Sequence, residues 1–89
     1  MKKPKQLERV VKGFANHRRI EILELLSQSP ELSVVDISDK LKINYKTGAE
    51  HISRLAISGL VMKRNDVNSV RHALTKEGKA ILVFLRTLE

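Results

Sequence analysis

This chain contains four polar residues that suit the N-cap position of a helix, and each one precedes a segment with apolar residues at helical spacing. They are Asn16, Ser33, Asn44 and Thr75. Side chains of this kind accept hydrogen bonds from the free amides of a first helical turn. Pro4 also suits a first turn, so the sequence predicts five helices, of which the first two span residues 5–14 and 17–27.

A short β-hairpin is expected between the fourth and fifth helices. Gly59 is suited to end the fourth helix in the left-handed conformation, and residues 60–64 and 70–74 have the composition of strands. The intervening residues 65–69 are rich in turn formers. The sequence has no repeat, low-complexity tract or flexible linker, so it predicts one mainly helical domain with a small β-hairpin over residues 1–89.

The chain is strongly basic, with 17 basic and 10 acidic residues and a formal net charge of +7. This excess favours a polyanionic partner, although a plain basic surface would have the same composition. Only three residues are aromatic, which argues against stacking platforms for single-stranded nucleic acid. There is no cysteine, no apolar run of about 18 residues and no signal-peptide pattern. We therefore expect a cytoplasmic protein without disulfides or membrane contact.

The last helix is apolar around nearly its whole circumference. A helix of this kind must be covered on two sides, and a chain of this size has few elements to cover both. We therefore expect a homodimer through the N- and C-terminal helices; the alternative is that the first two helices cover the last one within one subunit. The predicted dimer residues are Leu7, Val10, Phe14, Ile81, Leu82, Phe84, Leu85 and Leu88.

Several segments resemble, in their order and spacing, the ArsR-type winged helix-turn-helix regulators of transcription. Residues 15–23 are similar to that family's opening Ala-Asp-Pro-x-Arg-x-x-Ile-Leu, and residues 32–41 look like its helix-turn-helix entry. Residues 44–61 resemble its recognition helix and exit, and residues 74–79 resemble the end of its wing. The metal-sensing members of the family use Cys, or His and Asp pairs, which this chain lacks in its last helix. The resemblance implies a double-stranded DNA-binding protein without the metal switch.

The same resemblance implies that residues 45–57 form a recognition helix that enters the major groove. On a helical wheel Gly48 lies on the inner side, where it would permit a close approach to the third helix. Residues near the N-terminus of such a helix contact base edges. Lys46 can donate to guanine, and Glu50 can accept from cytosine unless it pairs with Arg54 at i,i+4. The predicted contacts on this helix are Tyr45, Lys46, Thr47, Ala49, Glu50, Ser53 and Arg54.

Residues 60–74 would form the wing, on the DNA backbone or in the minor groove. Ile57 points outward on the wheel and is expected to pack under this wing. The alternative for the basic wing is an edge strand that its charges protect from aggregation. The predicted wing contacts are Lys63, Arg64, Arg71 and His72.

The function expected is sequence-specific regulation of transcription on double-stranded DNA. A winged-helix module for protein–protein contact in a larger complex is the alternative, and RNA binding is a third. The three histidines lie on different elements without ligand spacing, and no catalytic set of side chains is present, so we expect no enzyme, metal or cofactor. We also expect His51 to be hydrogen-bonded, and the basic first turn at residues 17–19 to have a carboxylate or phosphate partner.

Overall fold

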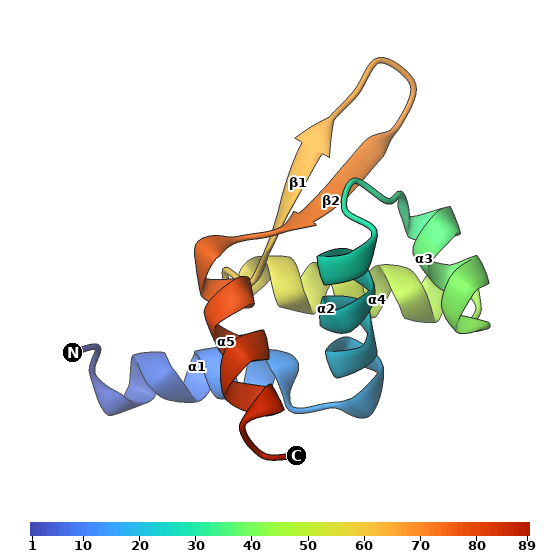
Figure 1. Cartoon of the computed structure of the whole chain (residues 1–89). Helices are drawn as coiled ribbons and strands as arrows, with labels where there is room; N and C mark the ends of the chain where they lie inside the picture. Colours follow the sequence, from blue (N-terminus) through green and yellow to red (C-terminus); the bar gives the residue numbers. More distant parts are fainter.

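The computed structural model describes all residues from 1 to 89, and it confirms the mainly helical architecture with a small β-hairpin (Figure 1). Four helices precede the hairpin and one follows it. In chain order the elements are α1 (Pro4–Phe14), α2 (His17–Gln28), α3 (Val34–Leu41), α4 (Tyr45–Ile57), β1 (Val61–Asn65), β2 (Val70–Leu74) and α5 (Lys76–Arg86). None of these helices combines the length and the apolar character that a membrane crossing needs.

The predicted caps begin the helices as expected. Asn16 Oδ1 accepts from the amides of Arg18 (2.9 Å) and Arg19 (3.3 Å) at the start of α2. The cap of α3 is reciprocal: the Asp36 amide donates to Ser33 Oγ (3.1 Å), and the Ser33 amide donates to Asp36 Oδ2 (3.2 Å). The hydrogen bonds from Ser33 lower the pKa of the Asp36 carboxyl group. These local bonds set the helix boundaries that the sequence predicts.

The same holds for the caps of α4 and α5. Asn44 Oδ1 accepts from the Thr47 amide (2.8 Å), and Thr75 Oγ1 accepts from the Gly78 amide (3.0 Å). Gly59 ends α4 with a φ of 78°, in the left-handed region. This conformation lets the chain turn out of the helix and into β1.

The core is almost entirely aliphatic. The side chains of Ile22, Leu23, Ile37 and Leu55 are fully buried, and they come from α2, α3 and α4. Full burial of one such side chain stabilises the fold by about 1.5–3 kcal/mol. The contribution of α5 is Leu82, which is 2% exposed. These contacts hold α4 firmly from one side and leave its other side uncovered.

Two glycines allow helices to cross closely. A Cβ on Gly48 would lie 2.2 Å from Ser38 Oγ, so this glycine brings α4 against α3 as the sequence predicts. Ser38 Oγ is buried there without a hydrogen-bond partner. A Cβ on Gly13 would lie 1.9 Å from Ser58 Oγ, which brings the end of α1 equally close to the end of α4. The two contacts fix α4 between its neighbours.

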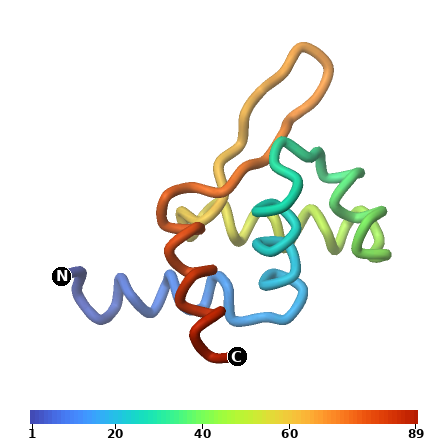
Figure 2. The backbone as a smooth tube through the Cα atoms, viewed as in Figure 1, coloured from blue at the N-terminus to red at the C-terminus, as the bar shows by residue number.

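The hairpin projects away from the helices, and Figure 2 shows its loop as the part of the chain furthest from both termini. Its strands are antiparallel, with a register from Val61↔Leu74 to Asn65↔Val70. At its base the loop before α3 joins the sheet: the Glu31 amide donates to the His72 carbonyl (2.8 Å), and the His72 amide donates to the Leu32 carbonyl (2.9 Å).

Candidate nucleic-acid interface

Helix α4 has one buried side and one open side. Gly48, Ile52 and Leu55 are buried, as the helical wheel predicts. On the open side, the large side chain of Tyr45 is 59% exposed. The other exposed residues there are Lys46, Glu50 and Arg54, and the partly exposed ones are Thr47, Ala49 and Ser53. The geometry therefore brings together on one open side all seven residues that the sequence singles out on this helix.

The charges on this side are not neutralised by the protein. Lys46 and Arg54 form no ion pair with any carboxylate of the chain. Glu50 does not pair with Arg54, although the two residues stand at the favourable i,i+4 spacing. Both cations are thus available to an external anion or to the acceptor groups of base edges.

The arginines of the wing are engaged within the chain instead. Arg64 forms an ion pair and hydrogen bond with Glu31. Arg71 Nε donates to Asp66 Oδ2 (3.2 Å), and Arg71 Nη1 donates to the Glu31 carbonyl (3.0 Å). The hydrogen bonds from the Val67 amide and then from Arg71 lower the pKa of Asp66. Lys63 is the exposed wing cation without such a partner.

His72 and Ile57 do not lie where the sequence reasoning places them. His72 is 1% exposed, and its Nδ1 lies 2.9 Å from the Leu32 carbonyl oxygen, so it cannot contact DNA. The sequence contained a signal for this burial, because His72 stands two residues before the buried Leu74 and therefore lies on the same face of the strand. Ile57 is 76% exposed. The prediction that it packs under the wing is wrong because the hairpin leaves α4 and extends away from it (Figure 1).

Glu31 is a residue that the sequence analysis missed. Its φ of 69° lies in the left-handed region, which is uncommon for a residue with a side chain. From this position its carboxylate holds Arg64 while its carbonyl holds Arg71. No sequence pattern pointed to it, because these partners lie 33 and 40 residues further along the chain.

The basic first turn of α2 finds two kinds of partner. Arg18 Nη1 pairs with Glu21 Oε1 at 3.1 Å, as the sequence reasoning expects for a cation at this end of a helix. Arg19 Nε instead donates to His51 Nδ1 (3.1 Å), which confirms that His51 is hydrogen-bonded. Burial and then the positive charge of Arg19 lower the pKa of His51. A neutral imidazole is the form that can accept this hydrogen bond.

The predicted dimer residues divide into buried and accessible ones. Phe14 is 8% exposed and Leu82 is 2% exposed, so both belong to the core of one subunit and are removed from the predicted seam. Their burial follows from the close approach of α1 and α5 to α2 and α4. Among the others, Leu7 (38%), Phe84 (52%) and Leu88 (68%) are exposed. The half-buried members are Val10, Ile81 and Leu85.

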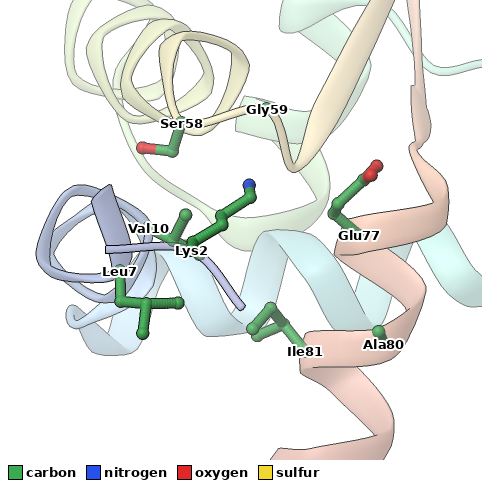
Figure 3. A pocket seen from close by; sticks show the side chains of 8 residues that line it. All are labelled: Lys2, Leu7, Val10, Ser58, Gly59, Glu77, Ala80 and Ile81. Carbon is green, nitrogen blue, oxygen red and sulfur yellow. The ribbon is translucent and has the colours of Figure 1, made fainter. Parts of the chain in front are cut away.

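A groove of 440 Å³ lies between α1 and α5, beside these accessible residues. Figure 3 shows Leu7 and Val10 on the α1 side, and Ala80 and Ile81 on the α5 side. Ser58 and Gly59, at the end of α4, form its third side. The groove therefore lies between the two helices that contain the predicted dimer residues. Nowhere in the chain do three or more His, Asp or Glu side chains converge as a metal ion would require.

Comparison with known proteins agrees with this geometry. A sequence profile described as "Bacterial regulatory protein, arsR family" matches residues 16–63, from the cap of α2 into the wing. The chain is also 34% identical to the transcriptional activator HlyU of Vibrio cholerae over 80 residues, which are 89% of this chain and 73% of HlyU.

Solved structures show the same likeness. Reduced HlyU from Vibrio cholerae has a TM-score of 0.80 at 32% identity, over 94% of this chain and 88% of that one. Mb0332 from Mycobacterium bovis, described as a homodimeric winged helix-turn-helix DNA-binding domain and a possible ArsR-family regulator, has a TM-score of 0.81 at 32% identity. That match covers 94% of this chain and 77% of Mb0332.

Proposed function

This chain belongs to the ArsR family of bacterial regulatory proteins and is a DNA-binding regulator of transcription, and on that premise we propose that α4 enters the major groove of its operator. The observation that carries the proposal is the open side of α4, where Lys46 and Arg54 have no intramolecular ion pair. The major groove admits one helix, and its base edges present acceptors to such cations.

The two sides of α4 have separate tasks in this proposal. The buried side fixes the position of the helix, because Ile52 and Leu55 pack in the core and Gly48 contacts α3. The open side is then free to meet DNA without rearrangement of the fold. Lys46 donates to a guanine edge, and Arg54 contacts the DNA backbone two turns further along α4. The Thr47 hydroxyl and the first-turn amides that the Asn44 cap leaves free bind a phosphate.

The wing has a smaller part in the contact with DNA. Lys63 is its available cation and binds the backbone beside the groove that α4 occupies. Arg64 and Arg71 primarily hold the hairpin in place, because each already has a carboxylate partner. Of the four wing residues that the sequence suggests, Lys63 is therefore the principal DNA contact and His72 is none.

We also propose that the chain acts as a homodimer through α1 and α5. The support is the exposure of Leu7 on α1 and of Phe84 and Leu88 on α5, together with the groove between these helices that Leu7 lines (Figure 3). An apolar surface of this kind favours contact with a second copy, and the related Mb0332 domain is homodimeric. Two copies of α4 related by a two-fold axis would read half-sites about 34 Å apart.

A selection of bound sequences from random duplex DNA tests the proposal, with light scattering to measure the mass in solution. We expect a two-fold symmetric site whose half-sites are about one helical turn apart, and a binding constant that falls steeply with salt. A mass of one chain at binding concentrations contradicts the dimer. Absence of duplex binding even at about 50 mM salt contradicts α4 as a DNA reader and favours a protein–protein module.

A further inference from the structure

The arginines of this chain fall into two groups. Of the seven in the sequence, four have a carboxylate partner within the chain. These four are Arg18, Arg64, Arg71 and Arg86. The other three, Arg9, Arg19 and Arg54, come from α1, α2 and α4, and all three line a single cleft between these helices.

This cleft has a strong excess of positive charge. It has a volume of 440 Å³, and Lys12 lines it as a fourth cation. Lys12 lies 3.8 Å from Glu8, but both side chains are largely exposed, so water screens this pair. Glu50 is the only carboxylate in the lining, and it forms no ion pair with any of the cations. Four cations therefore share the cleft with one carboxylate.

Arg19 gives the cleft a cation of fixed orientation. Its Nε donates to His51 Nδ1 (3.1 Å), and its Nη1 donates to the carbonyls of Lys12 (3.3 Å) and Gly13 (3.4 Å). All three acceptors are neutral when His51 is neutral, so they hold the guanidinium in place without cancelling its charge. Its Nη2 has no partner in the protein and is free to donate outward.

The surroundings add to the attraction for an anion. Arg19 stands in the first turn of α2, which contains no acidic residue, so the positive end of the helix dipole adds to the charge of the side chain. Arg9 and Gly13 are one turn apart on α1, which places Arg9 on the face that meets α4. Three guanidinium groups around one cleft repel one another. An anion between them would replace that repulsion by attraction, and a guanidinium group can form bidentate hydrogen bonds with phosphate oxygens.

We propose that this cleft binds a phosphate group, and that the phosphate comes from the DNA backbone next to the bases that α4 reads. Arg54 and Glu50 belong both to the cleft and to the open side of α4, so a strand bound there passes within reach. This source rests on the proposed function. A free phosphate ester would use the same chemistry, and the experiment separates the two sources.

The test uses the full chain and the variant Arg9→Gln, with Arg86→Gln as the matched control. Arg9 is exposed and has no side-chain hydrogen bond, so its replacement should leave the fold intact, as circular dichroism would verify. Arg86→Gln removes the same charge from α5, where Arg86 pairs with Glu24 and does not line the cleft. Duplex affinity is measured against salt, on the selected site and on an unrelated sequence. In parallel, millimolar inorganic phosphate is titrated without DNA while the amide NMR signals of Gly13 and Ser58 are followed.

If the cleft holds a backbone phosphate, Arg9→Gln weakens binding by about fivefold on both duplexes and reduces the salt slope by about one. Arg86→Gln leaves both quantities unchanged. If inorganic phosphate shifts the two amide signals in the wild type but not in Arg9→Gln, while duplex affinity is unchanged, the site takes a free phosphate. The proposal is overturned if neither quantity depends on Arg9. A wild type that binds no duplex refutes the proposed function, and the phosphate titration then decides the cleft by itself.

Discussion

Helix α4 and the wing both carry basic residues that the sequence assigns to DNA, but the two sets differ in their ion pairs within the chain. On α4, Lys46 and Arg54 form no ion pair within the chain. On the wing, Arg64 is paired with Glu31 and Arg71 with Asp66. Positive charge on the surface is therefore not the same as positive charge available to a ligand.

The difference follows from how each element is held. The inner side of α4 is buried in an aliphatic core, so the fold does not depend on ion pairs from the polar residues of its open side. The hairpin has a buried base, but in β1 only Val61 is buried and the other four residues are exposed. A two-stranded hairpin of this kind is marginally stable in water. Its arginines supply the missing connections, and this reduces their availability to DNA.

Replacement of Lys46 by alanine should have the largest effect on DNA binding. We expect Lys46→Ala to weaken binding to the selected duplex by about 1–3 kcal/mol without unfolding the domain, because it removes a base contact made by an exposed side chain. Arg64→Ala should weaken binding far less. Lys79→Ala, which removes one exposed lysine from α5, serves as the control of equal charge. Mobility-shift titrations measure all three, and wild-type affinity in Lys46→Ala would exclude it as a base contact.

The inner side of α4 can be tested by a double-mutant cycle at its contact with α3. Gly48→Ala alone should destabilise the fold by about 1–2 kcal/mol, because the new Cβ would lie 2.2 Å from Ser38 Oγ. Ser38→Ala removes a buried hydroxyl that has no hydrogen-bond partner. In that background Gly48→Ala should be neutral or stabilising by up to ~1 kcal/mol, since alanine favours a helix over glycine. Urea unfolding measures the coupling, and additive effects of the two changes would show that the contact is not close.

Much of the fold was predictable because its signals are local. Asn16, Ser33, Asn44 and Thr75 each bond to an amide two or three residues away, so the sequence alone predicts where the helices begin. The open side of α4 was likewise predictable, because helical periodicity separates its polar from its apolar residues.

What could not be predicted depends on contacts between distant segments. Arg64 meets Glu31 across 33 residues, and Arg19 meets His51 across 32, so no pattern within either segment reveals these pairs. The error on Ile57 has the same origin: its outward direction was predicted, but the path of the hairpin away from it was not. The burial of Leu82 depends likewise on how α5 packs against α2 and β2, which the composition of α5 does not specify.

Release of a wing arginine from its carboxylate partner should make its charge available to DNA, as the charges of Lys46 and Arg54 on α4 already are. Glu31→Gln removes the carboxylate that holds Arg64, so we expect non-specific duplex affinity at low salt to rise about two- to fivefold, with a salt slope steeper by up to about one. The stability of the domain should fall by less than about 1 kcal/mol, because the pair is on the surface. Glu24→Gln is the matched control, because it frees Arg86 from its ion pair between α5 and α2. Equal gains in both variants would indicate a general charge effect rather than release of the wing.

The smallest effect expected is a pH dependence of the stability, which arises at His51, where α4 contacts Arg19 of α2. Burial and then the charge of Arg19 lower the pKa of this histidine, while Glu50 acts in the opposite direction. The unfolded chain therefore binds a proton more readily than the folded one as the pH falls below about 6.5, so stability is complete above that value and decreases below it. Protonation would also end the hydrogen bond from Arg19, because both ring nitrogens would then be donors.

Urea unfolding at about pH 7.5 and about pH 5.5 measures this loss, on either side of the ordinary pKa of histidine. In His51→Gln the side-chain carbonyl can still accept from Arg19 but does not titrate, so the loss of stability between the two values should be smaller. The contribution of Arg19 should weaken at high salt, whereas that of burial should persist. Identical pH dependence in the two proteins would mean that the Arg19–His51 contact does not distinguish the protonation states. In that case the orientation of Arg19 in the cleft would not depend on a neutral His51.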